Sequence, residues 1–138
     1  MLNRQTKAAV AGLAASAAAL IAAPPAHAAP AGAPPAEPSA SRLVLAWTYE
    51  DGSDGSKVTL RCHPSGGSHP ERSEACDALT EAGGHFEMLR STGEPCTMQY
   101  RPVEVTATGH WFKRPVDYRE TFGNLCTAKV ETDRVFDF

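Results

Sequence analysis

The stretch LVLAWTY, residues 43–49, places its larger side chains on every second position. This alternation is typical of a β-strand with one buried face. Residues 50–56 (EDGSDGS) are turn formers, and residues 57–62 (KVTLRC) alternate again. The two segments therefore predict an antiparallel hairpin. Its inward side chains would be Leu43, Leu45, Trp47, Tyr49, Val58, Leu60 and Cys62.

After a loop at residues 63–70, the sequence predicts a helix over residues 73–82. Ser73 is a suitable N-cap, Glu74 places an acidic group in the first turn, and the glycine pair at 83–84 ends the helix. A short helical turn is expected at residues 85–90.

Further strands are expected in the second half of the chain. Residues 102–107 alternate and are followed by a turn at 108–109, with Pro115 interrupting the material from 111 to 122. Residues 129–138 supply the last strand. The expected fold is α+β: an antiparallel sheet of about five strands, with one main helix and one short helix packed on one face and two disulfides.

The N-terminal 41 residues differ in composition from the rest. Residues 1–28 have a basic start, an Ala-rich apolar run and a small-x-small motif ending at Ala28, as secretory signal peptides do. Residues 29–41 contain only Ala, Pro, Gly, Ser and one Glu, so a disordered leader is expected. Residues 42–138 would form one small extracellular domain, with no membrane anchor.

Charge and cysteine content narrow the function. The formal net charge is −3, and the sequence shows no cluster of basic residues. Both observations argue against nucleic acid or anionic membranes as partners. Four cysteines in a secreted chain indicate two disulfides, and three pairings are open. The pairing of sequence neighbours, Cys62 with Cys76 and Cys96 with Cys126, is preferred.

Catalytic and metal motifs are weak. The sequence has neither a G-x-S-x-G elbow nor an H-E-x-x-H helix, so no enzyme activity is expected. The spacing of Cys62, His63, His69 and Cys76 matches no zinc site. The segment from Asp51 superficially resembles a calcium loop, but Gly55 and Cys62 occupy the fifth and twelfth positions, where ligands are needed. No metal or cofactor is expected. Surface turn positions are predicted for His63, His69, His85 and His110.

The segment PCTMQYRP, residues 95–102, stands out. Met98 is long, unbranched and apolar, and can fill the primary specificity pocket of a protease. Cys96 would anchor the segment upstream, and Pro102 would stiffen it downstream. Such a loop loses little entropy on binding. An ordinary disulfide-anchored loop leading into a strand is the alternative from spacing alone.

Residues 96–103 (CTMQYRPV), Trp111, residues 116–126 (VDYRETFGNLC) and residues 135–138 (VFDF) together resemble the Streptomyces subtilisin inhibitor family. The resemblance implies a secreted inhibitor of subtilisin-like serine proteases. It also implies a five-stranded antiparallel sheet with two helices, and a homodimer formed by sheet-on-sheet contact.

The same resemblance implies the site. The scissile bond would join Met98 and Gln99, and Asn124 would support the loop from behind. The protease would also contact Pro95, Cys96, Thr97, Tyr100 and Arg101. The family's disulfides correspond to Cys62–Cys76 and Cys96–Cys126. Pro95 and Gly123 depart from the family pattern, at an outer pocket position and beside the supporting asparagine.

Met98 should suit subtilisins and also chymotrypsin-like enzymes, whereas a trypsin pocket carries a carboxylate that Met cannot pair. Two other interpretations stay open: a secreted binding module that uses the same loop for a non-protease partner, and a small secreted hydrolase.

Overall fold

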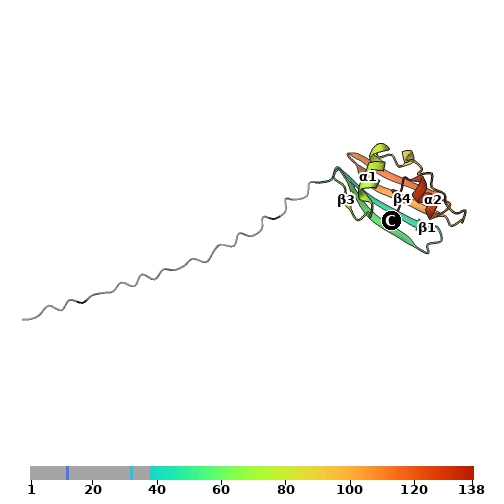
Figure 1. Cartoon of the computed structure of the whole chain (residues 1–138), viewed down its shortest axis with the longest axis horizontal. Coiled ribbons are helices and arrows are strands. Elements are labelled where there is room, and N and C mark those ends of the chain that lie inside the picture. The colour runs from blue at the N-terminus through green and yellow to red at the C-terminus, as the bar shows by residue number, and fades with distance from the viewer. Residues whose placement is uncertain (1–11, 13–31, 33–37) are drawn as a thin grey trace, which may run out of the picture. The chain divides into compact units, whose positions relative to one another are not determined.

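The computed structural model, which describes residues 38–138 together with Gly12 and Gly32, contains a five-stranded antiparallel sheet in the order β3-β2-β1-β4-β5 (Figure 1). The predicted signal peptide and most of the predicted leader lie outside the described residues. The first strand begins at Ser41, one residue before the predicted start of the domain. The elements are β1 (Ser41–Tyr49), β2 (Gly55–Cys62), β3 (Gly66–Gly67), α1 (Arg72–Glu81), the 3-10 turn η1 (Phe86–Met88), β4 (Val103–Trp111), β5 (Arg114–Phe122) and α2 (Leu125–Glu131).

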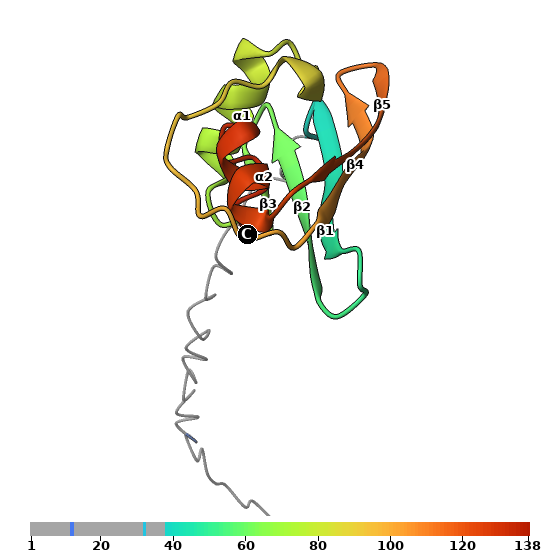
Figure 2. The same ribbon diagram turned by 90° about the vertical axis from the view of Figure 1, so that its right-hand side faces the viewer.

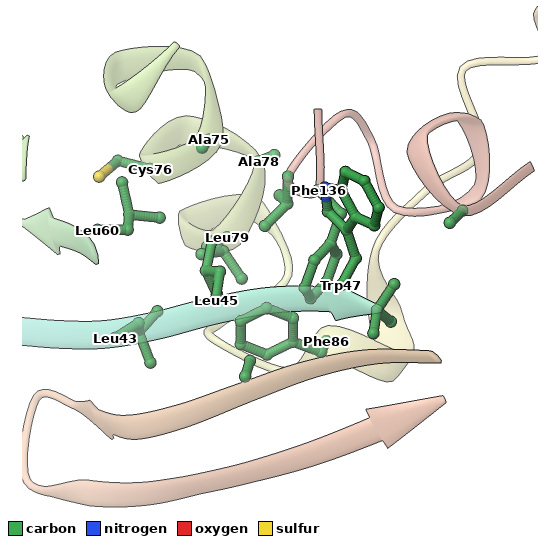
Figure 3. Close-up of a cluster of buried hydrophobic side chains, with 14 of the residues drawn as sticks. Leu43, Leu45, Trp47, Leu60, Ala75, Cys76, Ala78, Leu79, Phe86 and Phe136 are labelled. Carbon is green, nitrogen blue, oxygen red and sulfur yellow. The ribbon is translucent and has the colours of Figure 1, made fainter. Parts of the chain in front are cut away.

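The predicted hairpin is β1 and β2, with Leu43 opposite Leu60 in the register. Leu43, Leu45 and Leu60 are fully buried, whereas the alternate residue Val44 is 36% exposed. The alternation of the sequence therefore reflects one buried and one open face of the sheet. Figure 3 shows the buried face, where Leu45 and Trp47 of β1 lie with Leu79, Phe86 and Phe136.

The helices cover this buried face of the sheet (Figure 2). Helix α1 buries Ala75, Cys76, Ala78 and Leu79. The predicted N-cap at Ser73 is wrong, because the helix begins at Arg72 and Glu71 occupies the cap position without a side-chain hydrogen bond. The predicted short helical turn is confirmed as η1.

The predicted turn at 108–109 is also wrong, because β4 continues to Trp111 and Gly109 pairs with Leu43. Gly109 has φ +135°, and a Cβ there would lie 2.2 Å from the carbonyl oxygen of Arg42. Glycine therefore marks a close approach between strands here, not a turn. The chain reverses after Trp111, and Pro115 is accommodated within β5, which is an edge strand.

The expected strand at residues 129–138 is absent from this part of the chain, which instead contains helix α2 followed by a turn. Two helices agree with the fold that the family resemblance implied. After the turn, Val135 and Phe136 enter the core, and the indole Nε1 of Trp47 donates to the carbonyl of Phe138 at 2.9 Å. The α+β prediction of five antiparallel strands and two disulfides is confirmed.

The prediction of a surface turn position is wrong for His69, and for His110, which is exposed, only the turn is wrong. His69 is fully buried: its Nδ1 accepts from the backbone N–H of Glu71 at 3.0 Å, so Nε2 carries the proton and donates to the carbonyl of Val135 at 3.0 Å. His110 lies within β4 and not in a turn. His69 thus connects the entry of α1 to the C-terminal segment.

Candidate functional site

Residues 89–102 connect η1 to β4 without regular secondary structure, and the segment runs beside α2 (Figure 2). Met98 is 96% exposed and Tyr100 is 81% exposed, the two highest values among the large exposed apolar side chains of the described chain. Met98, the residue that the sequence singled out, therefore projects into solvent and is not part of the core. We call residues 95–102 the presented loop.

Both disulfides form as the sequence predicted. Cys96 of the presented loop is bonded to Cys126 in the first turn of α2, with the Cα atoms 5.8 Å apart. Cys62 at the end of β2 is bonded to Cys76 of α1, with the Cα atoms 5.6 Å apart. In the Cys62–Cys76 disulfide, neither sulfur is a free thiolate that could bind zinc.

Asn124 lies directly behind Met98. Its amide Nδ2 donates to the carbonyl oxygens of Thr97 at 3.2 Å and Gln99 at 3.0 Å. Its Oδ1 accepts from the backbone N–H and the hydroxyl of Thr127, at 2.8 and 3.0 Å, and so caps α2. Because Thr127 fixes which end of the amide accepts, both Nδ2 hydrogens are directed at the carbonyls that flank Met98.

Downstream, backbone hydrogen bonds attach the presented loop to the sheet. The N–H of Arg101 donates to the carbonyl of Gly123 at 2.9 Å, and the N–H of Glu50 donates to the carbonyl of Pro102 at 3.0 Å. Gly123 therefore supports the loop through its backbone. A Cβ at this position would meet nothing closer than the ring of Tyr100 at 3.9 Å.

Upstream, the segment is attached to the C-terminal region. The N–H of Thr92 donates to the carbonyl of Val130 at 3.0 Å, and Glu94 forms an ion pair with Arg134. Hydrogen bonds from Arg134 and from Thr92 hold the pKa of Glu94 below its usual range. Arg134 also forms an ion pair with Asp137 at 2.7 Å, so one guanidinium connects Glu94, just before the presented loop, to the C-terminal turn.

A hollow of about 170 Å³ lies behind the presented loop. The loop is therefore held by hydrogen bonds and a disulfide at separate points and is not packed against the core. The residues that line the hollow are Tyr49, Thr97, Gln99, Arg101, Asn124, Leu125 and Cys126.

Other kinds of site find little support in residues 38–138. No group of three or more His, Cys, Asp or Glu side chains there is arranged to hold a metal ion. No helix of that region is long and apolar enough to cross a membrane.

The structure brings together the predicted loop residues, Asn124 and the Cys96–Cys126 bond. Sequence reasoning missed two contributions, the Glu94–Arg134 pair and the contacts of the Arg101 side chain with the β1–β2 turn. The available signal for the second was the aromatic Tyr49 followed by the turn formers after it.

Comparisons with known proteins identify the family of this chain. The model of the subtilisin inhibitor-like family matches residues 38–124. A subtilase-type protease inhibitor from Streptomyces fradiae is 45% identical over 107 residues, which cover 71% of this chain and 74% of the relative. Subtilisin inhibitor-like protein 1 from Streptomyces cacaoi is 46% identical over 85 residues, 59% of this chain and 77% of the relative.

Among solved structures, sermetstatin from Streptomyces caespitosus, crystallised in complex with Bacillus licheniformis subtilisin, matches with a TM-score of 0.54. It is 26% identical, and the match covers 71% of this chain and 98% of sermetstatin. A family match over most of the described domain, relatives at 45% identity and a shared fold all lead to one conclusion: this chain belongs to the subtilisin inhibitor-like family and is not an enzyme.

Proposed function

We propose that this chain is a secreted inhibitor of subtilisin-like serine endopeptidases that presents the Met98–Gln99 bond as a substrate. The single observation that carries the proposal is the exposure of Met98 between two carbonyls that Asn124 holds in place. Family membership and the subtilisin complex of sermetstatin support the class of target. Secretion rests on the signal-like residues 1–28.

The mechanism follows from how the loop is held. The protease serine adds through Oγ to the carbonyl carbon of Met98, and the tetrahedral intermediate expels the amine of Gln99, which takes the proton from the catalytic histidine. The Cys96–Cys126 bond retains the acyl side, and the contacts of Asn124 and Arg101 retain the amine side. The amine can therefore attack the acyl-enzyme again before water does, which reforms the peptide bond.

The test is a titration of a subtilisin with the purified protein. An inhibitor abolishes protease activity at about one equivalent, whereas a binding module for another partner leaves activity intact and a hydrolase consumes substrate by itself. Mass spectrometry after brief exposure should show one nick, between residues 98 and 99, with both fragments still joined by Cys96–Cys126. A first cut elsewhere would contradict the assignment.

We also propose a homodimer through the open face of the sheet, opposite the helices. Val44 lies on that face in β1, the central strand, and is 36% exposed. An apolar residue at the centre of a sheet face is a natural contact for a second copy. Analytical ultracentrifugation should show a dimer that Val44→Arg converts to monomer. The control Met88→Arg, in η1 outside this face, should remain dimeric. A monomeric unmodified chain would refute the dimer and leave the inhibition untouched.

A further inference from the structure

The two sides of the presented loop are anchored by different means. Upstream of Met98 the anchor is covalent, through Cys96 and Cys126. Downstream no disulfide holds the loop, and the anchors are noncovalent, including the hydrogen bonds from the backbone of Arg101 to Gly123 and from Asn124 to the carbonyl of Gln99. The downstream side carries the amine that must be retained if the bond is to reform, so it is the weaker point of the mechanism.

The side chain of Arg101 adds an anchor on that side. Its Cζ lies 3.6 Å from the centroid of the Tyr49 ring at the end of β1. Its Nη2 donates to the hydroxyl of Ser53 at 2.8 Å, and its Nε lies 4.0 Å from Oδ2 of Asp51. The guanidinium thus contacts the chain's own β1–β2 turn by stacking, by a hydrogen bond and by charge. We call these contacts the Arg101 clamp.

The receiving turn is itself ordered. The carboxylate of Asp51 accepts hydrogen bonds from the backbone N–H and the hydroxyl of Ser53, and these bonds, with the charge of Arg101, lower the pKa of Asp51. The hydroxyl that accepts from Arg101 is therefore fixed by Asp51. A guanidinium that lies over a ring and reaches a fixed acceptor loses little entropy per contact.

We propose that Arg101 is a positioning residue of the inhibitory loop: its clamp on Tyr49 and Ser53 holds the new Gln99 amine in reach of the acyl-enzyme. This inference rests on the proposed function. The clamp acts two residues downstream of Gln99, and the hollow behind the loop leaves that short segment without core packing. Without the clamp, the cleaved segment becomes more mobile, and the rate of hydrolysis of the acyl-enzyme rises relative to the rate of religation.

The experiment measures the chain as a slow substrate of subtilisin. Arg101→Met, which keeps the apolar stem and removes the guanidinium, should raise kcat for cleavage of residues 98–99 about tenfold and shift the equilibrium toward the nicked form by a similar factor. The kcat of Arg101→Lys should lie between those of the unmodified chain and Arg101→Met, because an ammonium keeps the charge but cannot stack on the ring as a guanidinium does. Arg90→Met is the matched control, since Arg90 pairs with Glu81 of α1 instead.

Two variants outside the loop make the test independent of direct contact between Arg101 and the protease. Ser53→Ala and Tyr49→Leu each remove one receiver of the clamp, and each should raise kcat by a few fold. In a double-mutant cycle, Ser53→Ala should add nothing once Arg101 is Met. A merely structural role would lower the melting temperature of these variants without changing kcat.

The outcomes separate the two proposals. If the unmodified chain fails to inhibit subtilisin, the proposed function is wrong and the clamp has no role to play. If the unmodified chain inhibits, but Arg101→Met is cleaved as slowly and reforms its bond as fully, the function stands and the clamp is overturned. An effect of Arg101→Met that Ser53→Ala and Tyr49→Leu do not share would likewise overturn the clamp.

Discussion

The single side chain of Met98 should choose the target. Trypsin carries a carboxylate at the base of its primary pocket, so Met98→Lys supplies the missing charge partner, and we expect the inhibition constant for trypsin to fall at least about 100-fold. The measurement is inhibition of trypsin and subtilisin by the same preparations. Met88→Lys is the control, because Met88 is also exposed but lies in η1. Equal gains from both variants would mean that position 98 is not the specificity residue.

Asn124 performs two tasks that substitution can separate. Asn124→Asp keeps an oxygen that accepts from Thr127 and caps α2, but it replaces the donors to Thr97 and Gln99 with a carboxylate. Asn124→Ala removes both functions, at a further cost of about 1 kcal/mol for the cap.

We therefore expect both Asn124 variants to become temporary inhibitors that subtilisin digests over time, while only Asn124→Ala loses the stability of the cap. Chemical denaturation reports the stability, and mass spectrometry over a time course reports the cleavage. An Asp variant that resists cleavage as well as the unmodified chain would exclude the support role of Asn124.

Among the larger structural units, the two disulfides should have separable effects. Their loops span 14 and 30 residues, which the chain-entropy model values at about 3 and 3.6 kcal/mol. Replacing Cys62 and Cys76 with Ala should cost stability alone, because that bond joins β2 to α1. Replacing Cys96 and Cys126 should also speed cleavage after Met98. Cleavage rates are compared at a temperature where both variants stay folded, and equal rates would contradict the anchoring role.

The upstream attachment should respond to pH. The pKa of Glu94 is lowered in the folded chain, so its ion pair with Arg134 stabilises fully above the ordinary glutamate pKa and is lost as the pH falls through the lower, folded value. Hydrogen exchange of the Thr92 amide, corrected for intrinsic rate, should therefore be slower in the unmodified chain than in Glu94→Gln above about pH 5. The difference should vanish well below about pH 4. Glu74→Gln on α1 is the control, and a pH-independent difference would exclude the ion pair.

Helix α2 shows where reasoning from local pattern failed. Only two of its residues, Ala128 and Val130, are buried, too few to give a helical period, and the alternation of residues 135–138 favoured a strand. Asn124 was the available start signal. By contrast, β1 and β2 were predictable because each strand has one buried and one exposed side, which produces the alternation of larger apolar residues with smaller or polar ones in the sequence.

For the molecule as a whole, long-range contacts explain what the sequence could not reveal. Gly109 is fixed by the carbonyl of Arg42 on another strand, and Arg101 meets Ser53 across 48 residues. Several parts of the site were predictable from the sequence. The disulfide cysteines followed from the secretory compartment and their spacing, Met98 from its long apolar side chain in a polar loop, and Asn124 from the family resemblance. The side-chain contacts that position the loop depend on which segments the fold brings together, and no local motif encodes them.

His69 provides a global prediction, since its ring connects the entry of α1 to Val135 across 66 residues. His69→Ala would leave a cavity and two unpaired backbone groups, so we expect a loss of about 3 kcal/mol in the free energy of unfolding. Urea denaturation is the measurement. The exposed His85→Ala is the control and should change stability by less than about 0.5 kcal/mol. Similar losses for both variants would mean that the buried contacts of His69 are not the cause.

The hollow behind the presented loop has an engineering consequence. The side chains of Thr97, Met98, Gln99 and Tyr100 are exposed, and none of them belongs to the buried hydrophobic cluster. Randomising these four positions should therefore leave the framework able to fold, provided the disulfide and Asn124 are kept. A combinatorial library displayed on phage could then be selected for new protease targets.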